Sequence, residues 1–161
     1  MAKKEVSLKN YVYLILIILI TMGIVYYLYL WFSEYKEEVK KMSDLGNYLQ
    51  VINYNDLENY IIENDTICMY VTNNDLSLAN FENNLKKFLV EENLGRLILY
   101  LDVSSVFHEG KYELCNVEFN SVPLFVMFNN GKITSSYDIK QNKYDINKIS
   151  SYLQSVGVIN D

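Results

Sequence analysis

The chain has 161 residues, of which half are hydrophobic, with 14 basic and 20 acidic side chains and a formal net charge of −6. Residues 34–161 hold 11 of the basic and 19 of the acidic groups, a formal −8, and the chain has a single arginine. This balance argues against a nucleic-acid partner, because phosphate binding needs clustered lysine and arginine. Two cysteines and one histidine are too few for a disulfide scaffold or a Cys/His zinc site. We expect neither a metal nor a cofactor.

A charge-free run from Tyr11 to Phe32 follows the N-terminal tail of residues 1–10. As a helix, its 22 residues would measure about 33 Å, which is enough to cross a bilayer. Tyrosine and tryptophan near both ends fit the aromatic belts of a membrane span. A cleaved signal peptide would have a shorter apolar region and a small-x-small cleavage site. We therefore expect an uncleaved signal anchor, a transmembrane helix over residues 11–32, rather than the buried helix of a soluble core.

The orientation of this span is predicted from the residues around it. Three lysines precede the run and three follow closely, so the count of positive charges is equal at the two ends. A long C-terminal domain is translocated largely regardless of its charge, which favours a cytoplasmic N-terminus. More lysine than arginine, with abundant asparagine and tyrosine, suggests an AT-rich bacterial source. The expected location is a bacterial cell membrane, single-pass, with the domain outside.

An amphipathic connector helix is expected over residues 33–52. Apolar residues recur there every three or four positions, at Tyr35, Val39, Met42, Leu45, Leu49 and Ile52. The stripe is shorter than the three or four heptads of a coiled coil. It fits a face that lies against the following domain or lipid better than it fits a dimerising stalk, through which the chain would form a homo-oligomer.

Residues 53–161 alternate between helical and strand patterns, and we expect them to form the outer domain. A helix between two continuous apolar strands predicts a βαβ unit and an α/β core. Asp56 is the expected N-cap of the first helix, Gly95 the expected C-cap of the second, and an Asn-Gly pair the turn of a hairpin. The predicted helices cover residues 56–64, 80–93 and 144–156, and the predicted strands cover 66–72, 97–103, 124–128 and 132–137.

The segment Val122–Lys132 contains the only proline, Pro123, immediately before a strand that ends in the Asn-Gly turn. Proline cannot donate to a strand ladder, so it belongs at such a boundary. This segment and the order of the elements resemble the thioredoxin-like fold, in which a cis-proline begins the corresponding strand. The resemblance covers residues 50–158 and implies a central mixed sheet flanked by helices, with a cis bond between Val122 and Pro123.

The resemblance also implies a Cys-x-x-Cys motif at the start of the helix after strand 66–72, where the helix N-terminus lowers the pKa of a thiol. Here Asp75 and Leu78 occupy the expected cysteine positions. We therefore expect a redox-inactive domain without catalytic residues. Cys68 is expected to be buried in its strand. For Cys115, burial, a disulfide with Cys68 and a reactive thiol all remain open.

In thioredoxin-like proteins, the groove beside the cis-proline receives an extended peptide through the backbone of the preceding residue, which needs no thiol. By resemblance, the candidate peptide-binding residues are Val122 and Pro123, with Asp75, Leu76 and Leu78 opposite. Membrane-anchored chains of this arrangement resemble thioredoxin-like accessory proteins linked to bacteriocin production and secretion in low-GC Gram-positive bacteria. Those proteins usually keep Cys-x-x-Cys, and this departure counts against a role as a disulfide isomerase.

The predicted function is a membrane-anchored binding or accessory module for peptides or partner proteins, and not an enzyme. Two alternatives stand beside it. The first is a membrane-anchored thiol-disulfide oxidoreductase that uses its atypical cysteines. The second is a subunit of a membrane complex whose active part is the transmembrane helix and stalk.

Overall fold

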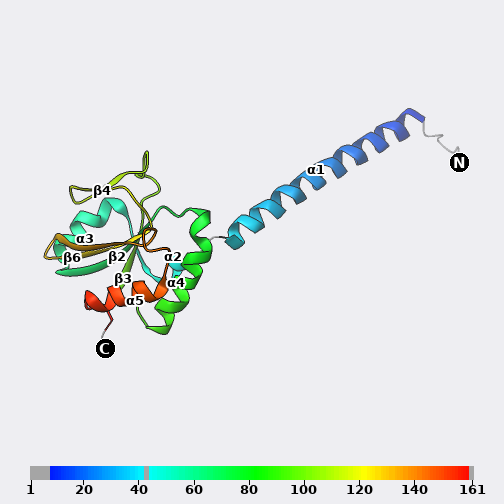
Figure 1. The fold of residues 1–161 in the computed structure, drawn as a ribbon. Coiled ribbons are helices and arrows are strands. Elements are labelled where there is room, and N and C mark those ends of the chain that lie inside the picture. Colours follow the sequence, from blue (N-terminus) through cyan, green and yellow to red (C-terminus); the bar gives the residue numbers. More distant parts are fainter. Residues whose placement is uncertain (1–7, 42–43, 160–161) are drawn as a thin grey trace. The chain divides into compact units, whose positions relative to one another are not determined.

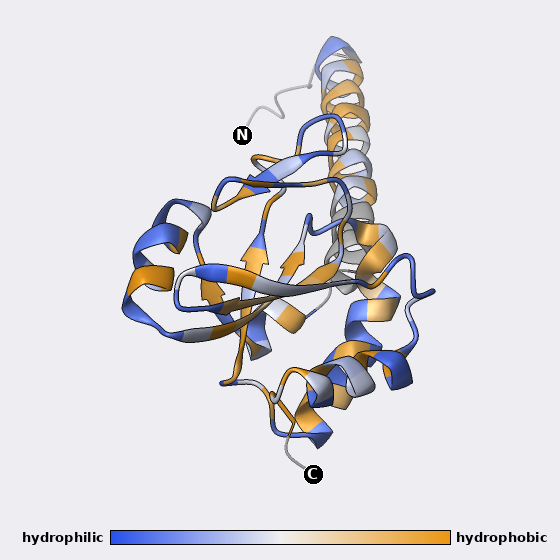
Figure 2. Ribbon diagram, turned by 60° about the vertical axis from the view of Figure 1, so that its left-hand side comes forward, coloured by the Kyte–Doolittle hydropathy of each residue, from blue (hydrophilic) through white to orange (hydrophobic). Residues whose placement is uncertain are grey.

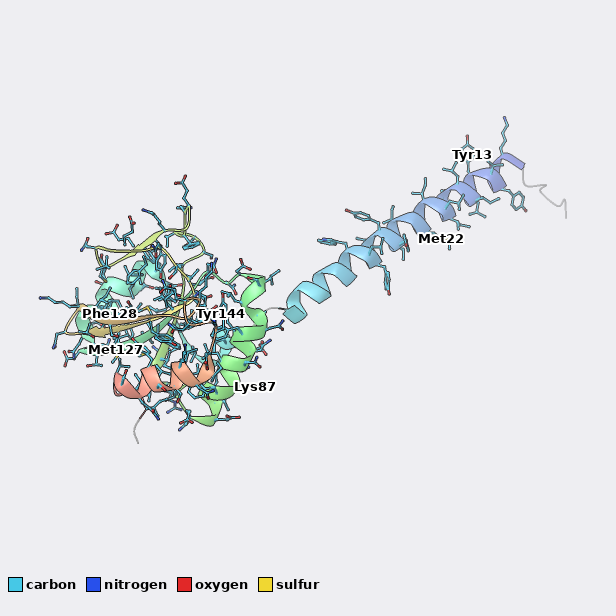
Figure 3. The ribbon with its side chains drawn as sticks, in the orientation of Figure 1. Tyr13, Met22, Lys87, Met127, Phe128 and Tyr144 are labelled. Carbon is cyan, nitrogen blue, oxygen red and sulfur yellow. The ribbon has the colours of Figure 1, made fainter. Side chains whose placement is uncertain are left out.

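The computed structural model describes residues 8–41 and 44–159, and the chain divides into two compact units, Met1–Lys41 and Met42–Asp161. The described residues of the first unit form the helix α1 (Leu8–Lys41; Figure 1). Within it, the 23 residues Lys9–Trp31 are long and apolar enough to cross a membrane, and an 18-residue window of them reaches a mean hydropathy of 2.3. Hydrophobic residues recur along much of this helix in Figure 2, and Tyr13 and Met22 project from it in Figure 3.

The expected connector helix over residues 33–52 is wrong in its second half. Helix α1 ends at Lys41, and the second unit then contains a short helix, α2 (Leu45–Tyr48), and a strand, β1 (Gln50–Ile52). Three apolar residues of the stripe are therefore core residues of the outer domain, which begins earlier than position 53: Leu45, Leu49 and Ile52. A short helix followed by a three-residue strand reproduces helical spacing by coincidence. Met42 and the side chains of Tyr35 and Val39 lie outside the described residues.

A five-stranded mixed sheet forms the centre of the second unit, in the order β1-β3-β2-β6-β7. Strands β2 (Thr66–Thr72) and β3 (Ile98–Asp102) are parallel, and β1 is parallel to β3. Strands β6 (Leu124–Asn129) and β7 (Lys132–Asp138) form the predicted antiparallel hairpin, and β6 is antiparallel to β2. The sequence therefore predicted the strands of the sheet correctly, apart from β1.

Helices cover both faces of this sheet (Figure 1). Buried side chains of α4 (Ala79–Glu91), α5 (Ile146–Ser155) and α2 form one core cluster with Tyr70 and Phe125 of the sheet. Helix α3 (Leu57–Glu63) contributes to a second cluster, with residues of β2, β3 and β6 that face the other way. All three predicted helices of the domain are present. Asp56 is the N-cap of α3, although its side chain makes no capping hydrogen bond.

The predicted C-cap of α4 at Gly95 is wrong. Glu92 is the cap, and Asn93 takes the left-handed backbone conformation with a φ of 56°. The Leu94 N–H closes the motif by donating to the Leu89 carbonyl at 2.9 Å. Gly95 is needed for space instead, because a Cβ atom there would lie 2.7 Å from Cζ of Tyr48.

Replacing Gly95 with alanine is expected to lower the free energy of unfolding by about 1–2 kcal/mol. The new methyl group would displace the Tyr48 ring, whose hydroxyl donates to the Leu89 carbonyl at 3.1 Å. Urea unfolding of the full chain measures the loss. Gly46→Ala is the matched control, because its Cβ would meet no atom closer than 3.4 Å and α2 would gain a better helix former. Equal losses in the two variants would contradict this role for Gly95.

The stretch between β3 and Pro123, in which the sequence predicted no strand, contains a second, two-stranded sheet. Strands β4 (Tyr112–Leu114) and β5 (Val117–Phe119) are antiparallel, and Cys115 and Asn116 form their turn with φ values of 50° and 63°. Tyr112 and Leu114 are buried in the same cluster as α3. The sequence missed this hairpin because Cys-Asn is not one of the pairs that signal a tight turn.

Candidate functional site

A pocket of about 270 Å³ lies where β2 ends and the segment before β6 approaches it. The β2–α4 loop, the stretch after β3, the residues before Pro123 and the β7–α5 turn all contribute to its lining. Three predicted site residues, Asp75, Leu78 and Val122, line it together. The other two do not line it: Pro123 is buried, and Leu76 is 45% exposed on the surface outside the pocket.

The β2–α4 loop is fixed by hydrogen bonds of Asp75. Its Oδ1 accepts from the Ser77 N–H at 2.8 Å and begins a single turn of 3₁₀ helix, η2 (Leu76–Leu78), which leads into α4. The hydrogen bonds from Ser77 lower the pKa of the Asp75 carboxyl. Asp75 therefore caps the turn, at the place where the resemblance would put a reactive cysteine.

The backbone of Val122 is unpaired at the rim of this pocket. Neither its N–H nor its carbonyl takes part in a hydrogen bond with the described residues. The preceding residue is held on two sides, because the Ser121 carbonyl accepts from the Tyr112 hydroxyl at 3.3 Å and the Ser121 hydroxyl donates to Asp138 at 2.5 Å. The Val122–Pro123 bond is cis. Leu124 then begins β6 opposite Val71 at the end of β2.

An aromatic contact positions one of the residues that line the pocket. Tyr144, labelled in Figure 3, lies in the β7–α5 turn and lines the pocket. Its ring packs on Phe81 of α4 with centroids 5.1 Å apart. Tyr144 and the preceding Lys143 both have left-handed backbone conformations, with φ values of 58° and 59°. Such conformations are unfavourable for non-glycine residues, and the contact with Phe81 helps to hold the turn beside the pocket.

A buried hydrogen-bond cluster anchors the loop that lines the pocket. Glu82 of α4 is only 1% exposed, and its Oε1 accepts from the Tyr70 hydroxyl at 2.8 Å and from the Thr72 hydroxyl at 2.9 Å. The Thr72 oxygen accepts in turn from the Asn74 N–H at 3.3 Å. The pKa of Tyr70 is well above its usual value, mainly because the hydroxyl is buried and secondly because it lies beside the Glu82 carboxylate. Glu82 was detectable in the sequence, because it shares the spacing of Leu78, Leu85 and Leu89 on one helical face.

The two cysteines lie on opposite faces of the sheet. Cys68 is buried as predicted, in the cluster with α4 and α5, whereas Cys115 packs against the cluster on the α3 side. Both thiols are free, and the intervening sheet rules out the pairing that the sequence left open. Burial raises the pKa of Cys68 to about 12. The pKa of Cys115 is raised by burial and, to a smaller extent, by the nearby Glu58 carboxylate.

No protein-family model matches this chain, and no curated protein matches it. Several solved structures are similar to it. A designed protein shares 20% identity over 68% of this chain and 97% of its own, with a TM-score of 0.44. Mitochondrial thioredoxin 3 of Saccharomyces cerevisiae shares 13% identity over 69% of this chain and 98% of its own, with a TM-score of 0.46. Thioredoxin f2 of Chlamydomonas reinhardtii shares 8% identity over 70% of this chain and 99% of its own, with a TM-score of 0.46.

The fold assignment rests on the strand order and on the place of Pro123. Three parallel strands are followed by an antiparallel hairpin that begins directly after Pro123, with helices on both faces. The predicted α/β class and thioredoxin-like fold, preceded by one apolar helix, are confirmed.

Proposed function

We propose that the protein is a redox-inactive thioredoxin-like module, anchored in a membrane by one span, that binds extended peptides of partner proteins at Val122. The observation that supports this proposal most directly is that the N–H and carbonyl of Val122 have no hydrogen-bond partner among the described residues. An extended peptide can satisfy both groups by strand addition, and a neighbouring pocket then selects a side chain of the peptide. Such binding needs no thiol.

The size of the pocket supports a peptide rather than a free cofactor. Sites for drug-sized molecules and cofactors usually measure about 300–1,000 Å³, whereas a cavity of about 150 Å³ already holds benzene. At about 270 Å³, this pocket fits one amino-acid side chain. The rest of a bound peptide would lie along the backbone of residues 120–122.

The chemistry of the two cysteines supports a function other than redox catalysis. Disulfide exchange requires an accessible thiolate. Burial raises the pKa of Cys68 to about 12, and the pKa of Cys115 is also raised. Neither cysteine lines the pocket beside Val122. These features favour a binding module over the alternative of a thiol-disulfide oxidoreductase.

The cellular setting is part of the same proposal. The apolar helix α1 would anchor the chain in a bacterial cell membrane, with the N-terminus cytoplasmic and the domain outside. The resemblance to bacteriocin-associated proteins suggests exported peptides as the ligands. In the alternative role as a stalk subunit, contacts would come from α1; the burial of Leu45 and Leu49 in the domain core shortens the face available for that role.

Photo-crosslinking in the membrane tests the peptide site. A photoreactive residue in place of the exposed Ser77, which lines the pocket, should capture a peptide or partner. The same residue in place of Ile62, which is 80% exposed on α3, is the matched control and should capture little. Equal capture from both positions would contradict a site at this pocket. Insulin reduction by the full chain, abolished in Cys115→Ser alone, would contradict redox inactivity.

A further inference from the structure

A second pocket shares part of its lining with the candidate pocket. It measures about 380 Å³, and Asn120 and Ser121 line both pockets. These two residues directly precede Val122 in the chain. An extended peptide advances about 3.3 Å per residue. A peptide that pairs with the backbone of Val122 can therefore place one side chain in each pocket.

The second pocket contains one charged residue, Asp138, which is partly buried. Its carboxylate accepts from two neutral donors, the Ser121 hydroxyl at 2.5 Å and the Gln141 N–H at 2.8 Å. Among the described residues, no lysine or arginine forms an ion pair with it. A carboxylate offers about four lone pairs, so it can accept from a further donor. A partly buried charge without a counter-charge is unfavourable, and a cation in this pocket would supply one.

The rest of the lining and the charge of the domain also suit a cation. Phe119 provides apolar surface, and the other lining residues are neutral. Residues 44–159 hold 15 acidic and 8 basic side chains, a formal net charge of −7. A negative domain attracts positively charged ligands over a distance and speeds their association.

We propose that the second pocket binds a lysine or arginine side chain of the peptide that pairs with Val122. This inference rests on the proposed function and names the chemical class of the peptide. The ammonium or guanidinium group donates to the Asp138 carboxylate, and the methylene stem lies on Phe119. A glutamate side chain would be repelled by Asp138, and a neutral side chain would leave it without a counter-charge.

Fluorescence anisotropy tests this selection, with the full chain in nanodiscs of phosphatidylcholine, which has no net charge. The probes are fluorescein-labelled, amidated peptides Gly-Ala-Leu-Ala-X-Ala-Gly and Gly-Ala-X-Ala-Leu-Ala-Gly, in which X is Lys, Arg, norleucine, Gln or Glu. Leucine and X are two positions apart, so they point to the same side of an extended peptide. In at least one series, the lysine and arginine peptides should bind about 10-fold more tightly than the norleucine and glutamine peptides. The glutamate peptide should bind most weakly.

Asp138→Asn should abolish the preference for lysine and arginine without weakening the norleucine peptide. Asparagine keeps one acceptor oxygen but removes the charge. Glu63→Gln, at an exposed position of α3 outside this pocket, is the matched control, because it removes the same charge and should keep the preference. A structural role of Asp138 would weaken all the peptides alike and would overturn the inference.

A second pair of variants leaves the hydrogen bonds of Asp138 in place. Ser136 is exposed and lines the second pocket, so Ser136→Lys adds a positive charge there and should also abolish the preference. Thr134→Lys, at an exposed position of the same strand outside the pocket, should keep most of it. Equal losses in these two variants would show that only the overall charge matters and would overturn the inference.

Two results with the natural chain distinguish this inference from the proposed function. Equal binding of the lysine, norleucine and glutamine peptides would overturn the basic-residue pocket, while leaving strand addition at Val122 standing. Binding of none of the peptides would overturn both proposals.

Discussion

Replacing Glu82 with alanine is expected to lower the free energy of unfolding by about 3–5 kcal/mol. The change removes the acceptor of two buried hydroxyl groups, those of Tyr70 and Thr72, and leaves a cavity between α4 and β2. Both hydroxyls would then be buried without that partner. Urea unfolding of the full chain, followed by the near-ultraviolet circular dichroism of its buried tyrosines, measures the loss.

Glu82→Gln is the matched control, since it preserves the volume and one acceptor oxygen, and it should lose much less than the alanine variant. A double-mutant cycle with Tyr70→Phe isolates the hydrogen bond of 2.8 Å. Tyr70→Phe should be costly in the natural chain and nearly neutral in the Glu82→Ala background. If the alanine and glutamine variants unfold at the same urea concentration, the buried cluster does not stabilise the fold as described.

Raising the pH from 8 to 11 is expected to lower the free energy of unfolding by about 3 kcal/mol or more. Burial raises the pKa of Cys68 from 9.0 to about 12, and also raises the pKa values of Tyr70, Tyr100 and Tyr112. A group whose pKa is raised by folding stabilises the folded state fully below its unfolded pKa. That stability is lost as the pH rises toward the folded pKa. Cys68 alone accounts for about 2–3 kcal/mol at pH 11.

Urea unfolding at a series of pH values measures this loss. Cys68→Ala removes the thiol and should flatten the curve between pH 9 and 11, leaving the contribution of the tyrosines. Cys115→Ala, at a less buried cysteine, is the matched control and should change the slope less. An identical pH dependence in the natural chain and in Cys68→Ala would show that the burial of this thiol is not coupled to folding.

The sequence predicted the central elements of the fold because their patterns are local. The apolar run of β2 predicted its bounds, and the Asn-Gly turn predicted the hairpin of β6 and β7. The spacing of apolar residues wrongly predicted that Leu45 and Ile52 belong to one helix. Ile52 lies instead in the three-residue strand β1, which pairs with Leu99–Leu101. Such a pairing between segments far apart in the sequence cannot be predicted from local spacing. Gly95 was misread for a similar reason, since its neighbour Tyr48 is distant in sequence.

The candidate site was only partly predictable. Asp75, Leu78 and Val122 were placed together through the resemblance, and they share a pocket. Lys140 and Tyr144 were missed, because their part in the lining depends on a turn in which two consecutive residues have positive φ values without a glycine. The unpaired backbone of Val122 depends on the positions of all its neighbours. No local pattern of residue types predicts that a backbone group lacks a hydrogen-bond partner.

The position of the sheet between Cys68 and Cys115 has a consequence for how the domain matures. Small exported domains often gain about 2–4 kcal/mol from an internal disulfide, and they then depend on an oxidising folding catalyst. This domain has only these two cysteines, and its own sheet keeps them apart. The interactions that stabilise it are noncovalent, so it can reach the same native state in reducing and in oxidising surroundings.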